Sequence, residues 1–396
     1  MNEYSQRILR EVEQNGNGSE LGIGCPGGFN SGSGSDFSSL GTFIGQNTHL
    51  KKLSLDSLGM DSLDVANSLF YDGLKQNSSI HELTIYCRNL AIVGGVGQKI
   101  LDAYEENNNL TLLRIDDADL QNGGENVIVT TLRSNTNLKH IYLNRCNITD
   151  EQLLPMVDAI KGHNLLIMLD LCGNVIGNTG CEALAGLLED PHSNLQTLYL
   201  SSNRIGEDGT TTLANSLANN TKLRELWLYN NSFGQSLREV LCKVLCNKTS
   251  INSIYSSNHT LETLGLPRRR DELGSLLKLN KGTNKSYVAI KKILKYHPRD
   301  IDMEPLFEWN MEGEGERDLK ALPYVVAWFE RADEAVVDDV DIPWDAETLS
   351  YEVAKRKLSA MYQFAQAMPL LFVPDLHAKG GDDKIGGSSR GVEVTK

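Results

Sequence analysis

The hydrophobic residues of this chain recur in a block that repeats about every 28 residues. Each block opens with the pattern L-x-x-L-x-L, and the matches begin at Leu50, Ile80, Leu110, Leu138, Leu166, Leu195, Leu223 and Ile251. Successive starts are 28 to 30 residues apart. Self-similarity at a fixed period of this size is the signature of a repeat architecture, in which each repeat contacts only its neighbours.

The hydrophobic period changes once within each block. Leucines first alternate with a period of two, as in a strand, and the next residues, such as 176–188 and 205–223, have helical spacing. Each unit is therefore predicted to be strand, turn, helix and turn. Stacking places the strands in one parallel sheet and the helices in an outer layer, with the leucines between them. Because a helix is wider than the strand spacing of about 4.8 Å, the stack should curve into a horseshoe with the sheet inside.

The clearest copies add a polar residue three places after the last strand leucine, at Asn174, Asn203 and Asn231, and two of them continue as I-G-x-x-G-x-x-x-L-A. On these residues the sequence, over about 36–265, resembles the ribonuclease-inhibitor-like leucine-rich repeat family. That family includes the repeats of ribonuclease inhibitor, the Ran GTPase-activating protein and NOD-like receptors. The resemblance implies an α/β solenoid that binds proteins on its concave face.

In that family the Asn or Cys of each turn bonds to neighbouring backbone. Four of the other five copies have Arg88, Ala118, Cys146 and His259 at this position, and of these only the cysteine lies within the family's range. Ser256 stands where a core leucine belongs, so the copy that begins at Ile251 is predicted to be the last and an imperfect one.

Outside the repeats, the chain is predicted to have three further parts. Residues 1–35 form an N-terminal flank whose Gly/Ser-rich segment is either a linker or, through Leu21 and Ile23, a degenerate capping repeat. Residues 266–375 have helical patterns and are predicted to cap the open core of the last repeat. Residues 376–396 lack an apolar pattern, and we expect them to be disordered.

Composition narrows the classes of partner. Asp and Glu number 52 against 38 Lys and Arg, a formal net charge of -14, which disfavours nucleic acid and membrane surfaces as main partners. The start of the chain is polar, and no stretch approaches the roughly 18 apolar residues of a spanning helix. Seven cysteines without a CxxC pair suit reduced thiols. We expect a monomeric cytoplasmic protein, with the nucleus as the alternative.

Charge is uneven towards the C-terminus. Residues 265–300 carry ten Lys or Arg against three acids, and 301–347 carry fifteen acids against three Lys or Arg. The two segments either form solvated, mutually attracting faces, or the basic one docks an acidic partner or RNA.

Each candidate motif for catalysis, a cofactor or a metal lacks residues that the chemistry requires. The glycines of 22–27 lack the helix and distant acid of a dinucleotide site, and 94–99 lack the Gly-Lys-Ser/Thr of a phosphate loop. Cys242 and Cys246 have no further ligands for zinc. There is no G-x-S-x-G elbow, and His140 is predicted as a contact residue on the concave face. We therefore expect no enzyme activity, cofactor or metal.

The concave face is the informative surface, because residues between the strand leucines must point to it. Aromatic residues gather on its C-terminal strands, with acids beside them. The predicted partner-binding residues are Tyr142, Asp170, Tyr199, Trp227, Tyr229, Tyr255, Asp116 and Glu225. The aromatic rings either stack on one another as a structural ladder or anchor a partner. The acids would favour a basic protein.

The function predicted from these features is non-enzymatic binding of a protein partner on the concave face. The alternative is a GTPase activator of the Ran type, for which the candidate contacts at the strand ends are Arg88, Arg145 and Arg204.

Overall fold

The computed structural model of the chain describes residues 19–23, 34–56, 68–87, 92–105, 108–120, 122–234, 236–266 and 271–297. The chain divides into two compact units, Met1–Tyr296 and His297–Lys396, and every helix and strand given below belongs to the first. The acidic segment 301–347, most of the predicted cap and the predicted disordered tail lie outside the described residues.

The described strands form one sheet, in which every neighbouring pair is parallel and the spatial order is the chain order. They are β1 (Glu20–Ile23), β2 (Lys52–Asp56), β3 (Glu82–Tyr86), β4 (Leu112–Asp116), β5 (His140–Asn144), β6 (Met168–Asp170), β7 (Thr197–Tyr199), β8 (Glu225–Trp227) and β9 (Thr263–Gly265).

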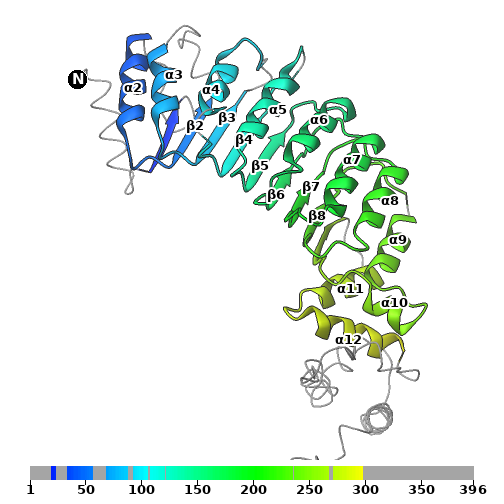
Figure 1. Cartoon of the computed structure of the whole chain (residues 1–396). Coiled ribbons are helices and arrows are strands. Elements are labelled where there is room, and N and C mark those ends of the chain that lie inside the picture. The colour runs from blue at the N-terminus through cyan, green and yellow to red at the C-terminus, as the bar shows by residue number, and fades with distance from the viewer. Residues whose placement is uncertain are drawn as a thin grey trace, which may run out of the picture. The chain divides into compact units, whose positions relative to one another are not determined.

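A helix follows each of the first eight strands, and these helices lie in a row along one side of the sheet (Figure 1). They are α2 (Gly34–Gln46), α3 (Ser68–Gln76), α4 (Val96–Glu105), α5 (Gly124–Ser134), α6 (Asp150–Ile160), α7 (Asn178–Glu189), α8 (Glu207–Ser216) and α9 (Ser236–Leu245). This alternation confirms the predicted fold class, an α/β leucine-rich repeat solenoid.

The core lies between the two layers, as the leucine pattern predicts. Leu198 of β7 and Leu226 of β8 are buried, whereas Tyr199 and Trp227 beside them are half-buried. The helices contribute residues such as Leu184 and Leu213 from the other side. Period-two alternation therefore decides which side chains enter the core and which face away from the helices.

The turn asparagines join neighbouring repeats through the backbone. The Asn203 Nδ2 donates to the carbonyls of Leu171 and Leu200, 2.9 and 3.0 Å away, and its Oδ1 accepts the Ile176 amide at 3.1 Å. Asn174 bonds in the same way. Cys146 Sγ donates to the Ile115 carbonyl at 3.4 Å, so this cysteine also bonds to the backbone of the preceding repeat. These bonds satisfy buried backbone groups at the three turns.

At the N-terminal end, Leu21 and Ile23 are fully buried in β1. This strand pairs in parallel with β2, with Leu21 opposite Leu53 and Ile23 opposite Leu55. Residues 20–23 thus form a strand of the solenoid, as the capping-repeat interpretation requires and the linker interpretation does not.

The prediction for the last repeat is wrong. Ile251 begins a short helix, α10 (Ile251–Tyr255), and the strand that pairs with β8 is β9, with Leu264 opposite Leu226. The repeat therefore starts at Leu261, 38 residues after Leu223. The physical reason is local, because the Ser250 side chain accepts the amide of Ser253 and caps a helix at that point. His259 is consequently not a turn residue of the kind predicted.

A second set of asparagines marks where the last repeat starts. Asn220 and Asn258 each stand three residues before a repeat leucine, and Asn258 Oδ1 accepts the amides of Thr260 and Leu261 at 2.9 Å. Its Nδ2 donates to the carbonyls of Leu217 and Asn220. The residue at the same place before Ile251 is Lys248, which cannot accept such bonds.

Two further helices, α11 (Glu272–Asn280) and α12 (Lys285–Tyr296), follow β9. Helix α11 packs on α9, and Asn280 donates to the Leu261 carbonyl at 2.8 Å. Lys292 of α12 is fully buried and donates to the Leu245 carbonyl at 2.6 Å, at the end of α9. Burial lowers the pKa of Lys292 to about 7. These helices bond to the last repeat through its backbone.

Candidate functional site

The candidate site lies on the side of the sheet opposite the helices, which we call the open sheet face. Its central column of residues runs across neighbouring strands as Arg114, Tyr142, Asp170, Tyr199 and Trp227, each opposite the next in the strand register. The sequence prediction placed these residues in this order, and the pairing of β4 through β8 brings them into one row.

Three rings form a contiguous aromatic cluster, which consists of Tyr199, Trp227 and Tyr229. The Tyr199 and Trp227 ring centroids are 5.7 Å apart with an edge-to-face angle of 70°, and those of Trp227 and Tyr229 are 5.8 Å apart. Such pairs add stability beyond burial. The ladder interpretation is therefore correct as far as mutual packing is concerned, yet all three residues remain only half-buried.

The indole of Trp227 lies over a glycine on the next strand. A Cβ at Gly265 would come within 2.8 Å of the indole Cε3 and 2.9 Å of the Trp227 Cα. Any larger residue would have to displace the ring, so Gly265 permits its position. Gly265 is not among the predicted site residues, because the leucine pattern predicts the last strand ten residues earlier in the chain.

Glu225 holds the polar ends of two rings. Its Oε2 accepts the Trp227 indole N–H at 3.3 Å and lies 3.5 Å from the Tyr199 hydroxyl. Burial and the neighbouring Glu225 carboxylate raise the pKa of Tyr199, so its hydroxyl stays a hydrogen-bond donor. Glu225 is consequently both a negative charge on the open sheet face and a support for the cluster.

Asp170 lies between two tyrosines. It pairs in register with Tyr142 on one side and Tyr199 on the other, and it is 8% exposed. Its Oδ1 accepts the Cys172 amide at 3.1 Å. Among the described residues, no lysine or arginine forms an ion pair with Asp170 or Glu225.

The N-terminal strands pair their charges internally. Lys52 and Glu82, on adjacent strands, are 3.0 Å apart. Arg114 Nε donates to Asp116 Oδ2 at 2.7 Å, and its guanidinium carbon lies 4.8 Å from the centre of the Tyr142 ring. Asp116, predicted as an accessible acid for a partner, is only 4% exposed and already bonded to Arg114. Asp116 thus stays a predicted partner-binding residue, but one that lies nearly buried beside Arg114.

Tyr255 is wrongly placed on a strand by the sequence prediction. It ends α10 instead of lying on a strand, its side chain is 42% exposed, and its carbonyl bonds to His259. The position opposite Trp227 on the last strand belongs to Gly265. The other predicted residues, Tyr142, Asp170, Tyr199, Glu225, Trp227 and Tyr229, all lie on the strands or strand ends as predicted.

Of the three arginines named for the GTPase-activator alternative, one is paired with a carboxylate, one is exposed and one is not described. Arg145 donates to both carboxylate oxygens of Asp117, with Nη2 and Oδ2 2.9 Å apart. Arg204 is exposed, and Arg88 lies outside the described residues. An arginine that reaches a partner's nucleotide must leave such a pair, so Arg145 is a poor candidate for that role.

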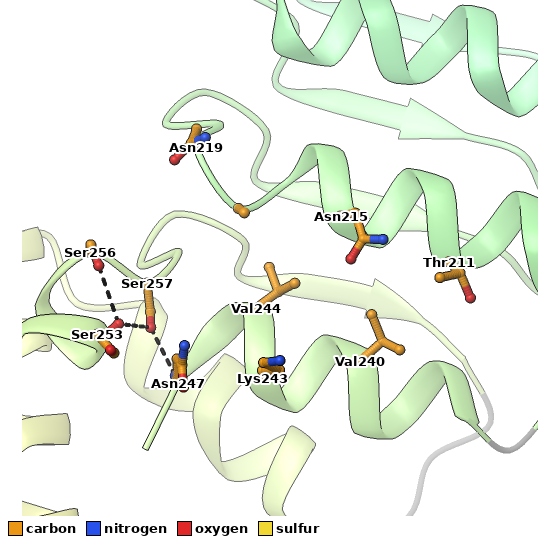
Figure 2. Close-up of a pocket in the computed structure, with 11 residues that line it drawn as sticks. Thr211, Asn215, Asn219, Val240, Lys243, Val244, Asn247, Ser253, Ser256 and Ser257 are labelled. Atoms are coloured by element: carbon orange, nitrogen blue, oxygen red, sulfur yellow. Dashed lines mark hydrogen bonds between the residues drawn. The ribbon is translucent and has the colours of Figure 1, made fainter. Parts of the chain in front are cut away.

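A separate groove opens on the helix side. Figure 2 shows its lining residues on α8 and α9. The cavity volume is about 490 Å³. Thr211 and Asn215 of α8 face Val240 and Val244 of α9, and the serines after α10 close one end. Lys243 is the charged residue of the lining. This mixed, largely uncharged groove is separate from the open sheet face.

The described residues contain no group of three or more His, Cys, Asp and Glu side chains that could hold a metal ion. Burial raises the pKa of the Cys172 thiol, the cysteine next to Asp170, to about 12, so it is a poor nucleophile at neutral pH. No helix in the described part of the chain is long and apolar enough to cross a membrane.

Comparison with known proteins is consistent with this architecture. The family model for the leucine-rich repeat matches residues 194–220. Leucine-rich repeat-containing protein 41 of Mus musculus is 34% identical over 149 residues, which are 36% of this chain and 18% of that protein. NACHT, LRR and PYD domains-containing protein 2 of Homo sapiens is 33% identical over 122 residues, 31% of this chain and 12% of that protein.

The chain thus spans less than a fifth of the length of these relatives. Among solved structures, the tropomodulin C-terminal domain of Caenorhabditis elegans is similar at 18% identity and a TM-score of 0.33, covering 43% of this chain and 98% of that one.

Proposed function

We propose that this chain, a leucine-rich repeat protein, binds a basic protein partner through the C-terminal strands of its open sheet face and has no enzymatic role. Leucine-rich repeat proteins are protein-interaction modules. The observation that carries the proposal is the coincidence of the aromatic cluster with two carboxylates, Asp170 and Glu225, that have no cationic partner among the described residues.

Physical chemistry favours this half of the face as the binding surface. Tryptophan and tyrosine dominate binding energy at protein interfaces, especially when their surroundings hold them in place. Here Glu225 and Gly265 fix the indole of Trp227 before any partner arrives, which reduces the ordering cost of binding. Carboxylates without internal partners leave a negative field that steers a basic protein.

The test is a comparison of variants with a partner recovered from source lysate by the intact chain. Trp227→Ala should weaken its binding by about 2 kcal/mol or more, and Tyr199→Ala by about 1 kcal/mol or more. Tyr255→Ala is the matched control, because it removes an exposed aromatic ring from α10, which is not a strand of the sheet, and it should leave the dissociation constant unchanged.

A partner that binds the Trp227→Ala and Tyr199→Ala chains as tightly as the original overturns the proposal. Trp227→Phe guards against local unfolding, since a ring can still pack over Gly265. Thermal melts of all variants accompany the binding measurements.

A further inference from the structure

The open sheet face contains one complete arrangement for holding an arginine. The guanidinium of Arg114 stacks 4.8 Å from the centre of the Tyr142 ring, and its Nε bonds to the Asp116 carboxylate at 2.7 Å. A planar cation is thus held by one aromatic face and one carboxylate, the geometry that suits guanidinium better than ammonium.

The neighbouring strand repeats the acceptor half of this arrangement. Asp170 pairs in register with Tyr142 from one side and with Tyr199 from the other, so its carboxylate has a tyrosine on each flank. Two strand spacings separate the backbones of these tyrosines by about 10 Å. In the described part of the chain, no cation pairs with Asp170.

The surrounding charges also favour a cation at this place. Arg114, the nearest positive residue of the column, has its charge offset by Asp116, and Glu225 adds a second carboxylate beside Tyr199. Asp170 is more than nine-tenths buried. A carboxylate in such surroundings is less screened by solvent and interacts more strongly with a cation that reaches it.

We propose that Asp170, with Tyr142 and Tyr199 on its two sides, receives an arginine side chain of the partner. This inference rests on the proposed function and adds the chemistry of the partner's anchor. The guanidinium donates two hydrogen bonds to the Asp170 carboxylate and stacks on the tyrosine rings, as Arg114 does on Tyr142. A lysine ammonium offers the same charge but neither the planar stacking nor the paired donors.

The experiment uses the full chain, labelled with ¹⁵N, and three short probe peptides: acetyl-Gly-Arg-Gly-amide, its lysine counterpart and its citrulline counterpart. Citrulline keeps the planar shape of arginine but has no charge. Binding is followed by NMR shifts of the Trp227 indole N–H and the Cys172 amide, the second of which bonds to Asp170. The arginine peptide should give saturable shifts at both signals, and the other two much weaker ones.

Asp170→Asn is the decisive variant, and it should weaken the arginine peptide by about tenfold or more. An asparagine oxygen can still accept the Cys172 amide, so the fold should persist, and a thermal melt verifies this. Asp158→Asn is the matched control, because it removes an equal charge from the exposed surface of α6, where Asp158 pairs with Lys161. It should not change the affinity.

Three results would overturn the arginine site: no saturation at about 10 mM peptide, equal affinity for the Asp170→Asn chain, or equal affinity of the lysine peptide. The recovered protein partner separates this inference from the proposed function. A partner lost with Trp227→Ala but retained with Asp170→Asn removes the arginine site and leaves the proposed function standing.

Discussion

The two halves of the open sheet face share one scaffold but treat their charges differently. On β2 through β5, cations and carboxylates pair with each other, as Lys52 does with Glu82 and Arg114 with Asp116. On β6 through β8, Asp170 and Glu225 have no cationic partner in the described part of the chain, and tyrosine and tryptophan rings surround them. The first half contains internal ion pairs, whereas the two carboxylates of the second half have no described cation beside them.

This difference teaches that aromatic and acidic residues must be judged by their partners as well as by their position. Asp116 and Asp170 are both nearly buried carboxylates. Asp116 bonds to Arg114, which stacks on Tyr142, and Asp170 lies opposite Tyr142 in the strand register. Arg114 donates to Oδ2 of Asp116, whereas no described cation pairs with Asp170. We expect the half without internal ion pairs to bind a basic partner at lower cost, because a group already bonded must lose that bond first.

The largest expected effect tests whether the halves share one core. Leu143→Ala in β5 and Leu226→Ala in β8 each remove a fully buried side chain. Each substitution should lower the free energy of unfolding by about 2 to 5 kcal/mol. Denaturant unfolding measures both. A loss at one site and none at the other would show that the two halves differ in their core as well as on their face.

An intermediate effect tests the internal pairing of the N-terminal half. Arg114→Ala leaves the nearly buried Asp116 without its cation and should cost about 1 to 3 kcal/mol of stability. Glu225→Gln keeps an oxygen that accepts the Trp227 N–H, and it should stay within about 0.5 kcal/mol. Unfolding experiments that give Glu225→Gln the larger loss would reverse the distinction between the halves.

The smallest expected effect is kinetic. Glu225→Gln removes one charge from the C-terminal half and should slow association with a basic partner about threefold to tenfold at low salt, with little change in dissociation. Asp158→Asn, away from the face, should leave the association rate unchanged. The difference should fade at about 1 M salt, where screening acts within about 3 Å. Equal slowing by both variants would argue for net charge instead of a local field.

The fold could be predicted almost completely because its signals are local and repeated. Leu198 and Leu226 are buried as the strand pattern predicts, and Asn174 and Asn203 bond to backbone as the family resemblance implies. The one failure, at Ile251, arose because apolar spacing alone cannot distinguish a strand from a short capped helix. The asparagine three residues before Leu261 was the available signal for the correct start.

The site was predictable only in part. Period two placed Tyr142, Asp170, Tyr199 and Trp227 on one face, and the register confirms their order. Their bonding partners were not predictable, because the contacts of Arg114 with Asp116 and Tyr142, and of Trp227 with Gly265, depend on how long side chains turn within the same face. Neither periodicity nor composition contains that information.

The sequence by itself determined the strand and helix of each repeat, the parallel sheet and the set of residues on its open face, because these follow from which positions must be buried. Only the tertiary structure decided which carboxylates are already paired and which tyrosines flank Asp170. The physical reason is that ion pairs, ring stacking and exposure depend on distances between side chains of different repeats, about 28 residues apart in the chain but about 4.8 Å apart across the sheet.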